Sequence, residues 1–166
     1  MEYTHYYDSP LGRIMLAADG QALTGLWFEG QKYFADKLDR DHRQKKLPVF
    51  EQAEKWLTLF LDGKAPDFTP PLSMKGTPFQ KEVWEELLAI PFGQTTTYAE
   101  IAIKIAKRRG LASMSAQAVG NAVAHNPISL IIPCHRVIGS DGSLTGYAGG
   151  LEKKVWLLAM ERQAAG

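Results

Sequence analysis

A proline-rich stretch near the middle of the sequence limits the ways in which this chain can fold. Pro66, Pro70 and Pro71 lie close together, and proline continues neither a helix nor the interior of a sheet. A stretch without regular structure at this place divides the 166 residues into two parts. We therefore expect an N-terminal domain over residues 1–70 and a C-terminal domain over residues 71–166.

The first part has the patterns of strands followed by one helix. Residues 13–18 and 23–28 are apolar segments that flank a turn-forming Asp-Gly dipeptide, and residues 3–8 predict a further strand. Residues 49–61 place large apolar side chains three and four positions apart, which predicts a helix with one buried face. We expect a small antiparallel sheet with this helix.

The second part is predicted to be mostly helical. Thr77, Thr97 and Ser115 each precede a helical pattern, and a hydroxyl at that position can cap the first turn of a helix. The helix over residues 116–124 is rich in alanine and glycine, so it can approach another surface closely. Two short helices joined by a turn, with a glycine-rich ribbon over residues 139–150, are typical of a winged helix-turn-helix. The expected fold class is α+β.

A last helix is predicted over residues 152–163. Its apolar residues predict that Val155, Trp156, Leu158 and Ala159 face the core. Glu161 lies on the same helix, and a carboxylate near the end of a chain is usually solvated. By itself this glutamate would indicate nothing about function.

Charge, cysteine content and the lack of long apolar runs limit the kinds of partner and compartment that this protein can have. With 19 basic and 18 acidic residues the net charge is +1, so a surface for a charged partner must come from a local patch. A single cysteine cannot form an internal disulfide and is typical of a reducing compartment. The first residues lack the pattern of a signal peptide, and no apolar run has membrane-spanning length. We expect a soluble, cytoplasmic monomer without a membrane partner, cofactor or metal.

The only cysteine, Cys134, lies at the end of an apolar run. Pro133 precedes it and His135 follows it. No aspartate or glutamate occurs in residues 101–140, whereas five lysines and arginines do, and nearby positive charge raises the fraction of the reactive thiolate. We therefore expect a field that favours the anion. The plainer alternative is a small buried hydrophobic residue, because neighbouring side chains need not face each other.

A wider pattern surrounds this cysteine and is more specific than the cysteine itself. The sequence from Gly76 onward resembles the O6-alkylguanine-DNA alkyltransferases, also called methylated-DNA–protein-cysteine methyltransferases. The first part of the chain resembles this family only in its general layout. The residues that carry the resemblance are Gly76-Thr77-Pro78-Phe79-Gln80, Tyr98, Ala118-Val119-Gly120, Asn126-Pro127, Pro133-Cys134-His135-Arg136-Val137, Gly146-Tyr147-Ala148-Gly149-Gly150 and residues 154–161.

The resemblance implies repair of DNA by irreversible transfer of an alkyl group from O6 of guanine, and from O4 of thymine, to Cys134. Each molecule would act once and without a cofactor. Such a transfer needs a base for the thiol, a residue that orients the base, and a proton donor near the purine. We assign these roles to His135, Glu161 and Tyr98. The resemblance adds Asn126, which would fix the backbone before the cysteine.

The same resemblance implies which residues contact the substrate. Pro133, Tyr147, Ala148 and Gly149 would form the wall of the alkyl pocket. The helix over residues 116–124 would enter the minor groove of double-stranded DNA that contains an alkylated guanine, with the damaged base flipped out. The expected DNA-contacting residues are Lys107, Ser115, Gln117, Ala118, Gly120, Asn121 and Arg136.

Two features depart from the family pattern. An arginine commonly precedes the Ala-Val-Gly motif, and this chain has Gln117, which can fill space in the duplex but carries no charge. The segment between the two short helices is also longer and contains Lys107-Arg108-Arg109. This basic run lies either near phosphates or in an exposed loop.

Two other functions are weighed against repair. A damage sensor of the alkyltransferase-like type would recognise the lesion without an acceptor cysteine, and the presence of Cys134 argues against it. A Cys-His hydrolase would need an oxyanion hole and a groove for a peptide or an ester, and no pattern in the sequence indicates either.

Overall fold

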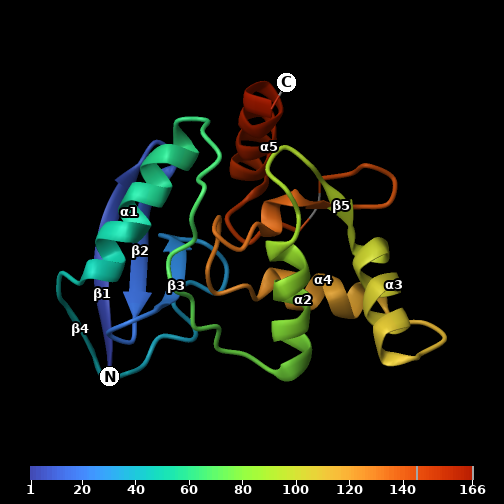
Figure 1. The fold of residues 1–166 in the computed structure, drawn as a ribbon, viewed down its shortest axis with the longest axis horizontal. Helices are drawn as coiled ribbons and strands as arrows, with labels where there is room; N and C mark the ends of the chain where they lie inside the picture. Colours follow the sequence, from blue (N-terminus) through green and yellow to red (C-terminus); the bar gives the residue numbers. More distant parts are fainter. Residues whose placement is uncertain (145, 166) are drawn as a thin grey trace. The chain divides into compact units, whose positions relative to one another are not determined.

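The computed structural model describes residues 1–144 and 146–165 and divides into two compact units (Figure 1). Unit 1 comprises Met1–Lys75 together with Pro127–Ser129, and unit 2 comprises Gly76–Asn126 and Leu130–Gly166. The sequence did not predict that Pro127–Ser129 belong to unit 1. The expected α+β class is confirmed.

Unit 1 is a four-stranded sheet with one helix. The strands are β1 (Glu2–Ser9), β2 (Gly12–Ala18), β3 (Leu23–Phe28) and β4 (His42–Gln44), and the helix is α1 (Pro48–Leu61). Their order is β3-β2-β1-β4, with antiparallel pairs except for the parallel pair β1–β4. The predicted strands and helix are present, whereas the short strand β4 was missed. The buried side chains of α1 are the apolar ones of the predicted stripe, and α1 contacts the first three strands.

The free edge of β3 is closed by two short segments of the chain. An edge strand presents N–H and C=O groups that need partners. Leu23 N donates to Pro71 O at 2.8 Å, and Ser73 N donates to Leu23 O at 2.9 Å. Leu26 makes the same pair of bonds with Pro127 O and Ser129 N, at 2.9 and 3.0 Å. The segment that leads toward the cysteine is therefore hydrogen-bonded to the sheet of unit 1.

Unit 2 is mostly helical. Its elements are α2 (Pro78–Leu88), β5 (Thr96–Thr97), α3 (Tyr98–Arg109), α4 (Ala116–Ala124), the 3₁₀ turn η1 (Cys134–Arg136), β6 (Val137–Ile138) and α5 (Leu151–Ala165). Thr77, Thr97 and Ser115 accept hydrogen bonds from backbone N–H groups three residues later, so all three predicted caps are confirmed. The short strands β5 and β6 pair in parallel.

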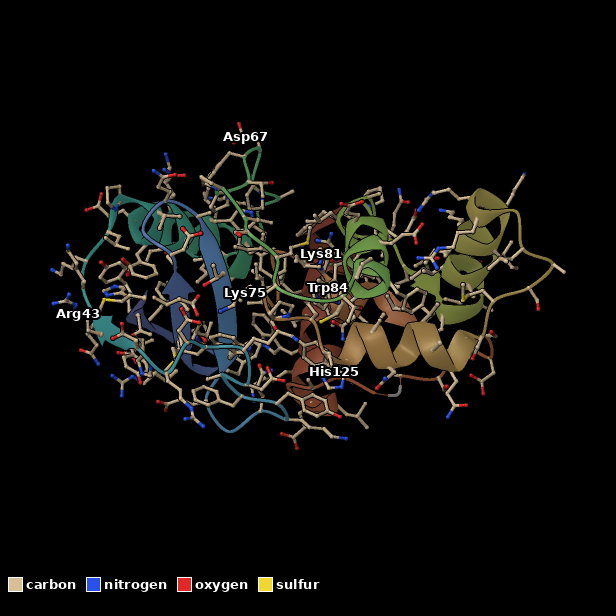
Figure 2. The ribbon with its side chains drawn as sticks, turned by 90° about the horizontal axis from the view of Figure 1, so that it is seen from below. Arg43, Asp67, Lys75, Lys81, Trp84 and His125 are labelled. Atoms are coloured by element: carbon tan, nitrogen blue, oxygen red, sulfur yellow. The ribbon has the colours of Figure 1, made fainter. Side chains whose placement is uncertain are left out.

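A buried tryptophan fixes α4 against α2. Trp84 (labelled in Figure 2) is fully buried, and its Nε1 donates to the carbonyl oxygen of Ala122 at 2.8 Å. Helix α4 also packs against α3, where Gly120 faces the ring of Tyr98. The small side chains of α4 allow this close packing, so α3 and α4 form the expected helix-turn-helix pair.

Helix α5 differs from its prediction in the face that it buries. Val155 and Trp156 were expected inside, but they are 51% and 38% exposed. Leu158 is buried as predicted, and Lys154, Leu157 and Glu161 are buried on this helix as well. The prediction was wrong because it treated charged side chains as solvated, whereas both charged groups here have partners inside the protein.

We predict that Trp84→Phe destabilises the protein. The change removes the indole hydrogen bond to the Ala122 carbonyl, which keeps its bond from the backbone N–H of His125, and it opens a small cavity. Together these losses cost about 1–3 kcal/mol. The free energy of unfolding from urea denaturation measures the loss. Trp156→Phe, on the exposed side of α5, is the control and should cost less than about 0.5 kcal/mol. Equal losses for the two variants would contradict the buried role of Trp84.

Candidate functional site

Cys134 begins the 3₁₀ turn η1 and is buried, with 5% of its surface exposed. The backbone before it is fixed by Asn126, whose Nδ2 donates to the carbonyl oxygen of Ile132 at 2.7 Å. Asn126 is itself buried, at the end of the segment that follows α4. This geometry supports the role expected for Asn126, although the role itself stays a prediction.

The environment of the thiol does not favour the anion. Burial raises the pKa of Cys134, and a hydrogen bond from Asn126 and the charge of Lys154 only oppose this effect. The prediction that the surroundings of Cys134 stabilise its thiolate is therefore wrong. The thiol stays protonated until a base takes its proton, which makes such a base a chemical requirement.

Most of the basic run that suggested this field is neutralised by helix α2. Arg108 forms ion pairs with Glu82 at 3.0 Å and with Glu86, and Arg109 pairs with Glu82 at 2.6 Å. The sequence window contained no acid, but the fold places two acids of α2 beside it. Lys107 remains exposed beside an apolar hollow between α3 and the loop that precedes α4.

The imidazole of His135 is fully buried beside a carboxylate. Its Nε2 lies 2.5 Å from Oε2 of Glu161, which comes from α5. Burial lowers the pKa of His135, and Arg136 and Lys154 lower it further, whereas Glu161 raises it. Burial alone would raise the pKa of Glu161, but the bonds and charges of His135 and Arg136 outweigh it and lower this pKa to about 2. The pair is therefore a neutral imidazole beside a carboxylate.

Arg136 is not available to DNA, which corrects its predicted role. Only 7% of its surface is exposed, and its guanidinium donates to both oxygens of Glu161. Its Nη1 donates to the carbonyl oxygen of Ile90 at 2.8 Å. The sequence placed this arginine among the expected DNA-contacting residues. In the structure it compensates a buried charge instead.

Two tyrosines lie near the cysteine. Tyr98 is partly buried at the start of α3, and burial and the nearby Cys134 raise its pKa. Tyr147 is buried, and the same two causes raise its pKa well above the usual value. Both phenols therefore remain protonated hydrogen-bond donors. Within residues 1–144 and 146–165, the hydroxyl of Tyr147 has no hydrogen-bond partner.

The other residues predicted to form the pocket wall are neighbours of Cys134 and Tyr147 in the sequence. Pro133 is buried, and Ala148 and Gly149 are half-buried in the turn after Tyr147. The carbonyl oxygen of Gly149 accepts a hydrogen bond from Lys153 Nζ at 3.2 Å. These positions are compatible with a pocket wall, and the wall itself stays a prediction.

The exposed side of α4 lines an open groove of about 830 Å³. Tyr98 forms part of this groove, as do Ser140 and Gly146 from the glycine-rich ribbon. The predicted DNA-contacting residues Ser115, Gln117, Ala118, Gly120 and Asn121 all line it. The structure therefore brings together five of the seven predicted contacts and excludes Lys107 and Arg136 from this groove.

Lys154 is the residue that sequence reasoning missed. It is completely buried, and its Nζ donates to the carbonyl oxygen of Val137 at 2.6 Å. Burial lowers its pKa, and the nearby Cys134 opposes that shift. The available signal was its spacing of seven residues from Glu161, which places both on one face of a helix.

Neither a metal site nor a membrane segment occurs in the described part of the chain. No group of three His, Cys, Asp or Glu side chains there could hold a metal ion. None of its helices is both long enough and apolar enough to span a bilayer.

The fold and the site define a class of protein, namely an α+β chain whose helical unit contains a helix-turn-helix pair and a buried Cys-His-Glu arrangement. Residues 78–163 match the model of the 6-O-methylguanine DNA methyltransferase, DNA binding domain, and residues 2–74 match that of its ribonuclease-like domain. The chain belongs to the 6-O-methylguanine DNA methyltransferase family.

Similar proteins agree with this assignment over nearly the whole chain. A methylated-DNA–protein-cysteine methyltransferase of Haemophilus influenzae is 40% identical over 96% of this chain and 86% of its own length. One from Methanosarcina barkeri is 46% identical over 94% and 96%. The crystal structure of the Mycobacterium tuberculosis OGT in complex with DNA is similar with a TM-score of 0.84 at 40% identity, covering 98% of this chain and 94% of that chain.

We predict that Glu161 makes the protein sensitive to acid. Its pKa of about 2 in the folded state lies below the value of 4.5 for an unperturbed carboxyl, so its stabilisation is present above 4.5 and is lost as the pH falls toward 2. Urea denaturation at about pH 5 and about pH 3 should show a smaller loss for Glu161→Gln than for the unchanged protein. Glu152→Gln on the exposed side of α5 is the control, and an equal loss in all three proteins would contradict the prediction.

Proposed function

We propose that this protein repairs DNA by transferring the alkyl group of O6-alkylguanine to Sγ of Cys134. The observation that carries the proposal is the buried cysteine next to a neutral histidine–carboxylate pair, on a chain that belongs to this family. The product is a thioether, which is stable, so each molecule acts once. Transfer from O4-alkylthymine stays a prediction of the family resemblance.

In the reaction, Sγ forms a bond to the alkyl carbon while the bond between that carbon and O6 breaks. The thiol proton goes to His135, directly or through a water molecule, and Glu161 stabilises the imidazolium that forms. The electron pair of the broken bond goes to guanine, which takes up a proton. Tyr98 is the proposed donor because its raised pKa keeps it protonated. The proton held by the His135 imidazolium then returns through solvent to the phenolate of Tyr98, so the transfer balances without a cofactor.

The proposed DNA surface is the groove-lining face of α4. Small side chains let a helix approach the minor groove closely, where the sequence is read poorly, as a protein that searches for lesions requires. The target base rotates out at a cost of roughly a few kcal/mol. The DNA complex of the M. tuberculosis relative supports DNA as the partner. We further propose that the protein acts as a cytoplasmic monomer.

We predict that Cys134 becomes alkylated once per molecule. Incubation with excess duplex that contains O6-methylguanine should increase the intact mass by a methyl group in place of one hydrogen. The Cys134→Ser variant should not gain mass, because its hydroxyl is a far weaker nucleophile. Repeated turnover by one molecule, or methylation of the serine variant, would exclude the proposed function.

We predict that Gln117 acts on the flipped state of the base and not on the chemistry. Gln117→Ala should slow transfer from duplex DNA while transfer from a free O6-benzylguanine-type base keeps its rate. Gln117→Arg should strengthen duplex binding by at most about 1–2 kcal/mol, the scale of a charge-assisted contact. Gln163→Ala, an exposed glutamine on α5, is the matched control for both substrates.

The single-turnover rates with the two substrates separate the possible outcomes. His135→Ala and Glu161→Gln should slow both substrates, because these residues act on the thiol. If Gln117→Ala slows the free base as much as the duplex, residue 117 does not hold the flipped state, and the placement of α4 in the groove of DNA is wrong. Affinity for duplex should also fall as salt rises.

A further inference from the structure

Arg136 makes more contacts than a single ion pair with Glu161 would need. Its Nε lies 2.9 Å from Oε1 of Glu161 and 3.1 Å from Oε2, and its Nη2 lies 3.0 Å from Oε2. Its Nη1 donates to Ile90 O, and the guanidinium lies 5.6 Å from the ring centre of Phe92. A planar guanidinium held on several sides fixes the position of the carboxylate that it binds.

The remaining contacts of Glu161 complete this arrangement. Oε1 accepts a hydrogen bond from the backbone N–H of Gly93 at 3.0 Å, and Oε2 contacts Nε2 of His135. Each carboxylate oxygen therefore interacts with Arg136 and with one further donor. A carboxylate with both oxygens occupied in this way cannot rotate without breaking several bonds.

The fixed carboxylate determines which nitrogen of His135 carries the proton. An ionised carboxylate only accepts hydrogen bonds, so Nε2 must be the donor. In a neutral imidazole Nδ1 then holds the lone pair, and this is the atom that can accept a proton. The guanidinium thus acts on the histidine through the carboxylate between them, in the manner of an outer partner that orients a ligand.

We propose that Arg136 is a positioning residue for the transfer reaction: by holding both oxygens of Glu161, it fixes the orientation and the tautomer of the His135 imidazole that takes the thiol proton. The proposal rests on the proposed function of Cys134 as the alkyl acceptor. It assigns to Arg136 a part in the chemistry in place of the DNA contact that the sequence predicted.

Arg136 also affects the charge of the imidazole. The charged groups that act on His135 are Glu161 and Lys154 from α5 and Arg136 beside it, and the neighbouring Cys134 thiol is faced by the neutral phenols Tyr98 and Tyr147. Glu161 favours the imidazolium, whereas Arg136 and Lys154 oppose it. Loss of the arginine charge therefore raises the pKa of His135. A larger fraction of the histidine is then protonated in mild acid and cannot act as the base.

Two substitutions separate the charge of Arg136 from its geometry. Arg136→Lys keeps the positive charge but cannot bind both oxygens and the Ile90 carbonyl at once. Arg136→Met removes the charge and keeps much of the side-chain length. Arg108→Gln is the matched control, because Arg108 also pairs with two glutamates of unit 2 but lies in the α2–α3 ion-pair cluster.

The experiment measures the single-turnover rate of transfer from a free O6-benzylguanine-type base as a function of pH. Arg136→Lys should lower the maximal rate by about 10-fold to 100-fold, with the acidic limb of the profile close to that of the unchanged protein. Arg136→Met should lower the maximal rate and also move the acidic limb to higher pH. Arg108→Gln should change neither. A merely structural role for Arg136 would leave the acidic limb in place in every variant, and that result would overturn the proposal.

A second measurement does not depend on transfer. Long-range ¹H–¹⁵N spectra report which ring nitrogen of His135 is protonated, and the unchanged protein should show Nε2–H with an unprotonated Nδ1. Arg136→Lys should show a mixture of tautomers. If Arg136→Met does not fold, Arg136→Lys decides alone, and a normal rate with a single tautomer overturns the proposal. Failure of the unchanged protein to accept an alkyl group is a different result and excludes the proposed function.

Discussion

One buried negative charge organises the functional unit of this protein. Burying an unpaired carboxylate costs on the order of several kcal/mol, so the chain must surround it with donors. Glu161 receives them from Arg136, His135 and the N–H of Gly93. These donors lie in the turn after α2 and in η1, far from α5 in the sequence. Satisfying a single charge therefore joins three segments, and the same bonds orient the imidazole beside Cys134.

Because the buried thiol is protonated, it needs a base that is itself neutral. A buried thiol with a raised pKa reacts slowly with an electrophile unless a base removes the thiol proton. A buried imidazole that remains neutral can be that base, and two protonated phenols nearby can donate hydrogen bonds to a purine. For a protein that can react only once, a nucleophile that stays inactive without its substrate protects the single reaction.

The segment before the cysteine is held by hydrogen bonds at several residues. Asn126 binds the carbonyl of Ile132, and the residues between them pair with the edge of β3 through Leu26. An edge strand needs partners, and here the chain that leads to the nucleophile supplies them. Pro127–Ser129 is therefore part of unit 1, although it lies between two segments of unit 2 in the sequence.

The sequence by itself determined those features that depend on near neighbours. Helix caps, the β1–β3 strands and the apolar stripe of α1 follow from residues within one turn or one hairpin. The set of Cys134, His135 and Glu161 came from the resemblance to a known family and from the groups that the transfer needs. Only the tertiary structure decided the partners of buried charges. Arg136 binds a carboxylate 25 residues away, and Lys154 is buried against a carbonyl 17 residues away. No local pattern encodes such pairs, because a charge is stable inside a protein only where the fold brings a partner to it.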